Sequence, residues 1–225
     1  MRIGTFEIEH LSEGIFETHK DGLYQKIDSS EITKKVGDTF SESYRNKIGI
    51  DPILIKTGTQ NILVDTGLGW GLDYKSSFTN TSNLYTNLDI FGLTPSDISY
   101  VVLTHLHFDH IGGATYVDES ISTKPTMPYA KYYLQKKEWN HALQQVQLEK
   151  PSTDYNLDEF YRLAANDLLV LLTDTVFELV PGIEIIRTGG HTPGHQIVKI
   201  TSDGETAYIF GDLIPSELQL NNSTA

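Results

Sequence analysis

Short apolar or alternating stretches typical of β-strands recur along this chain. They cover residues 3–9, 13–18, 52–57, 61–64, 100–104, 175–179, 183–188 and 207–210. The pair at 52–57 and 61–64 is separated by the turn T-G-T-Q, which predicts a hairpin with Gly58 at a positive φ.

Helical periodicity is clearest at residues 130–147, where apolar and aromatic side chains fall near one stripe. A second helical pattern covers 155–172, and Thr94-Pro95 predicts a short helix before the strand at 100–104. His141 lies on the first of these predicted helices. We interpret it as a packed or solvated histidine rather than as a metal ligand.

Two stretches are predicted as exposed loops. Residues 20–46 are polar and charged with few apolar anchors, and residues 68–87 are rich in Gly, Ser and Asn. The aromatic residues of the second loop either flank a pocket or fix the loop to the core. The polar end at 221–225 is predicted to fray.

The chain has 225 residues, of which 39% are hydrophobic and 21% charged, and we expect one domain over residues 1–225. No apolar run approaches the roughly 20 residues of a membrane helix. The N-terminus lacks the apolar core of a signal peptide, so we expect a cytoplasmic protein without a membrane partner. The chain has no cysteine, which excludes disulfides, thiolate metal ligands and cysteine nucleophiles.

The formal net charge is −13, from 17 basic and 30 acidic residues. Such a chain repels phosphate backbones and gains little from counterion release on nucleic acid. We therefore expect a small-molecule substrate and no nucleic-acid partner. Nothing in the sequence predicts the oligomeric state.

Four residues with metal-binding side chains follow the strand at 100–104 within six positions: His105, His107, Asp109 and His110. In extended chain, residues two apart point the same way, so His105 and His107 can reach one ion together. Asp109 and His110 are adjacent and diverge from that direction, which favours a second ion nearby. Imidazole and carboxylate groups suit zinc, manganese or iron.

A single histidine after a strand would most often be structural, but three histidines and an aspartate in six residues favour a metal site. The spacing differs from the helical H-E-x-x-H pattern of metalloproteases, which places its histidines four residues apart. Gly112 and Gly113 end the motif, and we expect them to permit a tight backbone turn beneath the ligands.

Further candidate residues follow other strands. His191 and His195 lie in a Gly-rich loop after the strand at 183–188. Asp65 directly follows the strand at 61–64, and Asp212 comes two residues after the strand at 207–210. Open α/β sheets place their sites at such strand ends, so we expect these residues to converge at one edge. Asp65 is either a turn-forming residue or a carboxylate that accepts the free N–H of a ligating histidine.

Together these motifs resemble those of the metallo-β-lactamase-fold hydrolase superfamily, and most of all its lactonase-like members. The resemblance spans about residues 50–212. The motifs that carry it are Asp65-Thr66-Gly67, His105-Leu106-His107-Phe108-Asp109-His110 with Gly112-Gly113, Gly190-His191-Thr192-Pro193-Gly194-His195, and Gly211-Asp212. It implies an α/β fold, a four-layer αββα sandwich with the metals at one edge.

The resemblance also implies two divalent metal ions, in the first place zinc, with manganese or iron as alternatives. The ligands that it implies for the first ion are His105, His107 and His191. Those that it implies for the second ion are Asp109 and His110, with Asp212 as the bridge. It gives His195 no ligand role, so we predict that His195 and Asp65 orient the ligands without touching the metal. Asp109 and Asp212 are the predicted catalytic carboxylates.

Two features depart from the family pattern. The superfamily normally supplies one more histidine after the bridging aspartate, and no histidine follows His195 here. We therefore expect that the C-terminal part of the domain is missing from this sequence. Acyl-homoserine lactonases usually carry a tyrosine shortly after that aspartate, and here the residues are Leu213-Ile214-Pro215.

The expected function is hydrolysis of a small ester or lactone by a water that a binuclear metal centre activates. The alternatives are a thioester hydrolase of the glyoxalase II type, a phosphodiesterase, and a non-catalytic metal-binding protein. The thioester hydrolase usually needs a basic C-terminal region, and the acidic net charge of this chain disfavours the phosphodiesterase. β-Lactam hydrolysis is disfavoured without an export signal. The di-iron redox members of the superfamily carry a glutamate where this chain has His107.

Overall fold

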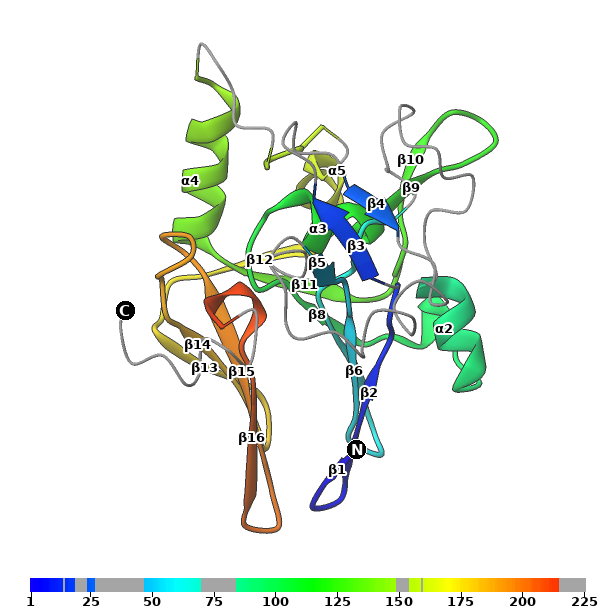
Figure 1. The fold of residues 1–225 in the computed structure, drawn as a ribbon, viewed down its shortest axis with the longest axis vertical. Helices are drawn as coiled ribbons and strands as arrows, with labels where there is room; N and C mark the ends of the chain where they lie inside the picture. Colours follow the sequence, from blue (N-terminus) through cyan, green and yellow to red (C-terminus); the bar gives the residue numbers. More distant parts are fainter. Residues whose placement is uncertain are drawn as a thin grey trace, which may run out of the picture.

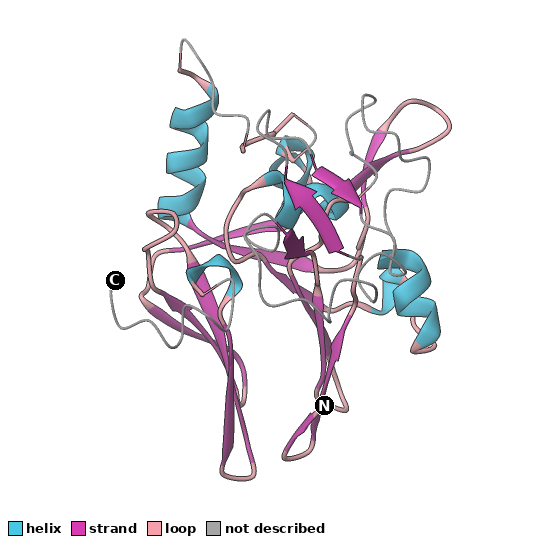
Figure 2. Ribbon diagram, viewed as in Figure 1, coloured by secondary structure: helices cyan, strands magenta, loops and turns pink. Residues whose placement is uncertain are grey.

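The computed structural model of the chain (Figures 1 and 2) describes residues 1–13, 15–18, 24–26, 47–69, 84–148, 154–158 and 160–214. Most of the predicted loop at 20–46, the aromatic part of the loop at 68–87 and the end at 221–225 lie outside these residues. Among the helices that the structure describes, none is both long enough and apolar enough to cross a bilayer.

A mixed seven-stranded sheet, in the order β1-β2-β6-β7-β8-β11-β12, forms one layer. Its strands are β1 (Arg2–Ile3), β2 (Phe6–His10), β6 (Ile53–Lys56), β7 (Asn61–Val64), β8 (Tyr100–Val102), β11 (Lys131–Gln135) and β12 (Leu169–Leu172). β6 and β7 form the predicted hairpin, in which Gly58 has a φ of 90°. In this sheet β7, β8, β11 and β12 pair in parallel, so their carboxyl ends meet at one edge.

A second, antiparallel sheet has the order β13-β14-β15-β16. Its strands are β13 (Val176–Val180), β14 (Ile183–Arg187), β15 (Gln196–Ser202) and β16 (Glu205–Ile209). The sequence analysis predicted three of these and missed β15. The remaining described strands form two small sheets. One pairs β9 (Thr115–Val117) with β10 (Thr123–Pro125). The other contains β3 (Ile15–Thr18), β4 (Tyr24–Lys26) and β5 (Lys47–Gly49).

The described α-helices are short except for one. They are α2 (Leu84–Ile90), α3 (Phe108–Ile111), α4 (Lys136–Val146) and α5 (Tyr161–Ala165). Single 3₁₀ turns are η2 (Pro95–Asp97), η3 (Gly112–Ala114) and η4 (Gly211–Leu213). The predicted short helix after Thr94 is η2, where the carboxylate of Asp97 accepts the N–H of Thr94 at 2.7 Å.

Both long helix predictions were partly wrong. Residues 131–135 of the predicted helix at 130–147 form β11, because they pair with β8 on one side and β12 on the other. Tyr132 faces one core cluster and Tyr133 packs against the other, which is the period of two of a strand. Of the predicted helix at 155–172, only α5 is helical, and residues 169–172 form β12.

Side chains of the large sheet alternate between two cores. Leu54 and Leu63 belong to a cluster with α2, α4 and α5, whereas Ile55 and Ile62 belong to a cluster with the second sheet. The two sheets therefore pack face to face, with helices on the outer side of the larger one (Figure 2). This confirms the expected α/β class. The described side chains of α2, α4 and α5 that join a core cluster all belong to the one on the outer side of the larger sheet.

Gln196 joins the two sheets near the carboxyl ends of β8 and β11. Its backbone N–H donates to the carbonyl of Thr104 at 2.9 Å. Its side-chain amide donates to the carbonyls of Leu103 and Tyr133, at 2.7 and 3.1 Å. These three bonds fix β15 of the second sheet against the edge at which the predicted ligands lie.

Candidate metal centre

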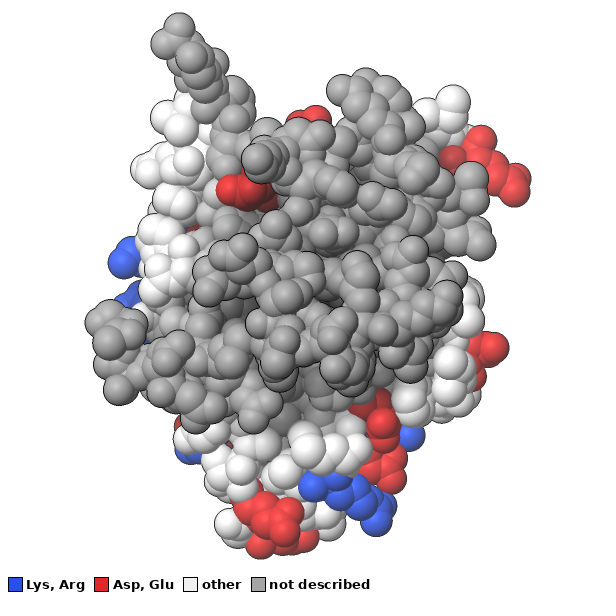
Figure 3. Space-filling view, viewed as in Figure 1, with Lys and Arg blue, Asp and Glu red and all other residues white. Residues whose placement is uncertain are grey.

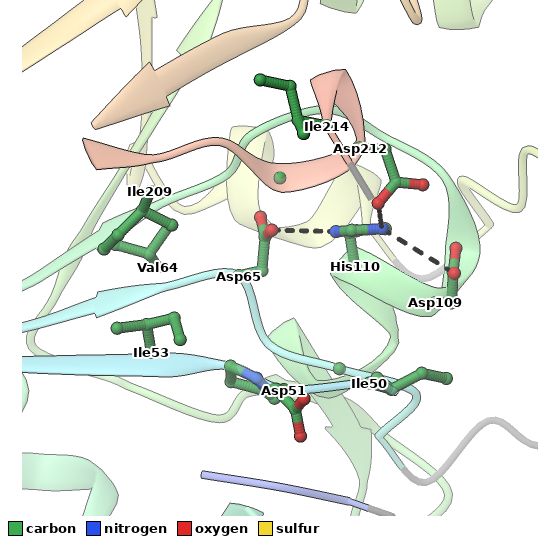
Figure 4. Close-up of a pocket in the computed structure, with 13 residues that line it drawn as sticks. Ile50, Asp51, Ile53, Val64, Asp65, Asp109, His110, Ile209, Asp212 and Ile214 are labelled. Atoms are coloured by element: carbon green, nitrogen blue, oxygen red, sulfur yellow. Dashed lines mark hydrogen bonds and ion pairs between the residues drawn. The ribbon is translucent and has the colours of Figure 1, made fainter. Parts of the chain in front are cut away.

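The strand ends bring the predicted site residues together from four places in the sequence. Asp65 follows β7, His105 comes three residues after β8, and Asp212 lies in η4 after β16. His191 lies in the loop between β14 and β15. Figure 4 shows Asp65, His110, Asp109 and Asp212 side by side at this edge.

His105, His107 and His191 form the first group. Their potential ligand atoms all lie within 4.8 Å of one another. The ring of His105 lies 4.5 Å from that of His107 and 4.7 Å from that of His191, and His191 Nε2 is 3.0 Å from His107 Nδ1. The two histidines that are two residues apart therefore do reach one point, as the strand geometry predicts.

His105, His110 and Asp212 form the second group, again within 4.8 Å. One oxygen of Asp212 lies 3.3 Å from His110 Nε2, and the other lies 3.6 Å from His191 Nε2. Asp212 thus faces both groups, which is the geometry of the predicted bridge. Asp109 lies beside the second group, with Oδ2 at 3.7 Å from His110 Nε2. The roles of these residues as ligands remain predictions.

Asp65 fixes the orientation of His110 and of the residue before His105. His110 Nδ1–H donates to Asp65 Oδ2 at 2.8 Å, which leaves Nε2 of His110 free to bind a metal. Thr104 donates both its N–H, at 2.7 Å, and its hydroxyl, at 2.8 Å, to the same carboxylate. Asp65 holds a positive φ of 58°, a conformation that Asp tolerates better than most residues.

Thr104 connects Asp65 to His105 through two hydrogen bonds of its hydroxyl. Its hydroxyl has one proton, which it donates to Asp65, so it accepts at 3.0 Å from Nδ1–H of His105. Nε2 of His105 therefore carries a lone pair. This atom is buried and has no hydrogen-bond partner among the described residues. A buried nitrogen lone pair without a partner, grouped with four other potential ligands, fits a divalent metal ion.

His195 is buried next to the site but lies outside both groups. The Thr188 hydroxyl donates to the backbone carbonyl of His195 at 3.2 Å and lies 3.1 Å from its Nδ1. The ring of His195 lies 5.4 Å from that of His105. The prediction that His195 orients neighbouring ligands is untested. His141 is also outside both groups, and its ring contacts Tyr155 at 5.8 Å.

Burial and nearby charges shift the pKa values of the site's histidines in different directions. Burial lowers the pKa of His105 well below its usual range, and burial with the nearby His191 lowers the pKa of His107 to about 4. Burial also opposes the charge on His110, but Asp109, Asp65 and Asp212 outweigh it and raise its pKa. The neutral imidazoles of His105 and His107 are the form that binds metal.

The pKa values of Asp109 and Asp212 are shifted in opposite directions. Burial raises the pKa of Asp109, and His110 only partly opposes this. Burial acts in the same sense on Asp212, but its hydrogen bond to His110 and the nearby charge of His110 outweigh it and lower the pKa of Asp212 to about 2. A carboxylate with a raised pKa is the better proton acceptor of the two.

Gly112 and Gly113 lie in the tight turn η3, as predicted, and they are also required for close packing. Gly112 has an ordinary helical φ of −57°, so the turn itself does not require glycine there. A Cβ on Gly112 would lie 2.0 Å from the carbonyl oxygen of Leu68, and one on Gly113 would lie 2.1 Å from that of Thr66. The segment after Asp65 therefore runs directly against the end of the motif.

Sequence reasoning missed several residues that support the site. Thr104 and Thr188 are hydroxyls placed next to ligand loops, and nothing in a single sequence marks them. Tyr155, whose ring lies 4.8 Å from that of His107, was assigned only to a helical pattern. Glu138 was missed because it lies on a helix whose other charged residues are exposed.

A pocket of about 230 Å³ opens beside the second group (Figure 4). Its polar residues are Asp51, Asp65, Asp109, His110 and Asp212, and its apolar side chains are Ile50, Pro52, Ile53, Val64, Ile209 and Ile214. Figure 3 shows both acidic and basic groups at the edges of the described surface in that view, with Lys and Arg next to acidic side chains at the lower edge.

Comparison with known proteins agrees with this geometry. The chain is 27% identical over 164 residues to an N-acyl homoserine lactonase of Bacillus cereus, covering 67% of this chain and 57% of that protein. It is 28% identical over 157 residues to one of Bacillus thuringiensis, covering 68% and 54%. The chain thus spans little more than half the length of these curated relatives.

Solved structures with the same fold cover nearly all of this chain. A probable metal-dependent hydrolase from Staphylococcus aureus superposes with a TM-score of 0.69 at 29% identity, over 94% of this chain and 74% of that one. AidC, a dizinc quorum-quenching lactonase, superposes with a TM-score of 0.67 at 26% identity, over 95% and 74%. The sequence profile of the Metallo-beta-lactamase superfamily matches residues 48–224, and this chain therefore belongs to that superfamily.

Proposed function

We propose that this chain binds two divalent metal ions, in the first place zinc, and uses them to hydrolyse small lactones or carboxylic esters. The observation that carries the proposal is the junction of the two ligand groups, which share His105 and are both faced by Asp212. Dizinc lactonases among its structural neighbours support it. The match to curated lactonases covers only part of their length, so the activity remains a proposal.

When bound, such ions polarise a carbonyl oxygen and lower the pKa of water towards neutrality. The first group supplies three imidazoles for one ion, and the second supplies His110 with Asp212. Asp109 is buried with a raised pKa, and its carboxylate is assigned to accept the proton of the attacking water. Asp65 keeps Nε2 of His110 free for ligation throughout.

The pocket beside the second group supports an ester or lactone with an apolar acyl portion. Ile53, Val64 and Ile209 lie together on one side, and His110, Asp109 and Asp212 lie on the other. Such a cavity binds the apolar part of a small molecule and leaves its carbonyl at the polar end. A small-molecule substrate agrees with the net charge of −13, which disfavours phosphate backbones.

The test is a substrate panel at saturating zinc with lactones, carboxylic esters, a thioester and a phosphodiester. We expect the highest kcat/KM on a lactone or ester, and loss of that activity in His105→Ala. A clear preference for the thioester or phosphodiester would contradict the substrate assignment. Full metal loading without turnover on any member would instead favour a non-catalytic metal-binding protein.

A further inference from the structure

Glu138 is a fully buried carboxylate in the first turn of α4, and it accepts three hydrogen bonds. One oxygen accepts the backbone N–H of Leu106 at 3.2 Å. The other accepts the hydroxyl of Thr192 at 2.6 Å and the backbone N–H of Gly194 at 3.1 Å. Buried charges are rare and persist where they are bonded in this way.

The three donors belong to the two loops that carry the first ligand group. Leu106 lies between His105 and His107, and Thr192 directly follows His191. These loops are more than 80 residues apart in the sequence, as the separation of 84 residues between His107 and His191 shows. A single carboxylate therefore spans the gap between the two halves of the group.

The helix that carries Glu138 is fixed to the large sheet. α4 directly follows β11, which pairs with β8, the strand that leads to His105. The loop that carries His191 packs directly on the start of this helix, because a Cβ on Gly194 would lie 2.1 Å from the backbone nitrogen of Glu138. Both loops are thus positioned relative to the same helix and the same sheet.

We infer that Glu138 is a positioning residue that holds His191 against His105 and His107 before a metal ion binds. It touches neither the metal nor the substrate, and it acts through Leu106 and Thr192. Hydrogen bonds to a charged acceptor are stronger and more directional than neutral ones, which suits this role. The inference rests on the proposed metal site. It adds the residue that assembles the first ligand group.

The test compares Glu138→Gln and Thr192→Val with the wild-type protein. Glutamine keeps the volume of Glu138 but offers one acceptor oxygen, so it serves either the Thr192 and Gly194 donors or Leu106, but not both. Valine keeps the shape of Thr192 and removes its donor. The matched control is Tyr132→Phe, which removes a buried hydroxyl that bonds Met127 and Ala114 and neither of the loops that Glu138 joins.

The readouts are the affinity for the first Zn²⁺, by competition with a chromophoric chelator, and the visible spectrum of the Co²⁺-loaded protein. Thermal unfolding of the metal-free protein measures the purely structural effect. We expect Glu138→Gln to weaken first-ion binding about 10- to 100-fold and to alter the Co²⁺ spectrum. Tyr132→Phe should lower the midpoint of unfolding and leave the affinity unchanged. Thr192→Val should act in the same direction as Glu138→Gln and add little to it in the double variant.

First-ion affinities equal to wild type in both Glu138→Gln and Thr192→Val would overturn the inference and leave the proposed function intact. If Glu138→Gln does not fold, Thr192→Val alone decides the question, because it removes one hydrogen bond and no charge. A wild-type protein that binds no Zn²⁺ would overturn the proposed function and this inference together. The two failures are therefore distinguished by the wild-type titration.

Discussion

Nδ1 of His110 lies 2.8 Å from Oδ2 of Asp65, and the same carboxylate accepts the hydroxyl of Thr104, which in turn bonds His105. One acid therefore fixes the ring nitrogens of two histidines. Each histidine is left with its Nε2 facing the centre, and this is the ring nitrogen that would bind a metal ion in its deprotonated form.

Asp65→Asn should weaken binding of the second ion about 10- to 100-fold with little loss of fold. An amide NH₂ in place of Oδ2 would face Nδ1 of His110 as a donor and move the ring proton to Nε2, which then has no lone pair. Asparagine tolerates the φ of 58° at this position, so the backbone should persist. Calorimetric titration with Zn²⁺ measures the effect, and an unchanged second-ion affinity would show that Asp65 does not set the tautomer.

Substitution of single histidines should show which of the two ions each histidine binds. His105 lies in both groups but has one free lone pair, at Nε2, so His105→Ala should lose the first ion, for which it is the predicted ligand. His191→Ala should affect the first ion and His110→Ala the second. His141→Ala is the control, since His141 lies outside both groups and should retain full loading. Elemental analysis of each purified variant tests this, and two ions in His105→Ala would refute the assignment.

Gly113→Ala should destabilise the fold and the site together. The new Cβ would lie 2.1 Å from the carbonyl oxygen of Thr66, so the segment after Asp65 has to move away. Overpacking of this kind costs about 1–3 kcal/mol or more. Gly92→Ala is the matched control, because nothing lies within 4 Å of its Cβ and only its φ of 69° is unfavourable.

Denaturant unfolding with and without zinc compares these two variants. Gly92→Ala should cost about 1–2 kcal/mol of unfolding free energy and keep the stabilisation that zinc adds. Gly113→Ala should lose that zinc-dependent stabilisation as well. Equal zinc stabilisation in the two variants would show that the close contact at Gly113 does not support the site.

The candidate ligands could be predicted because their chemistry is local in sequence. His105, His107, Asp109 and His110 fall within six residues after an apolar strand, and few other roles require that clustering. The strand end also fixes which ligands share a direction. The positions of Asp65 and Asp212 followed from the rule that strand ends meet at one edge of a sheet.

The other features depend on contacts between distant segments. Tyr132 and Tyr133 fit a helical stripe, and only pairing with β8 and β12 makes that segment a strand. Glu138 looks in the sequence like any surface charge of a helix, and its burial follows from the loops that close over it. A single sequence shows neither effect, because both arise from tertiary packing.

The central claim is that one edge of the fold holds two metal ions. Elemental analysis of the wild-type protein, purified without chelator and equilibrated with zinc, tests it most directly. The geometry predicts close to two ions per chain, since the two groups share only His105 and Asp212 faces both. One ion per chain or fewer at saturating zinc would contradict the binuclear centre.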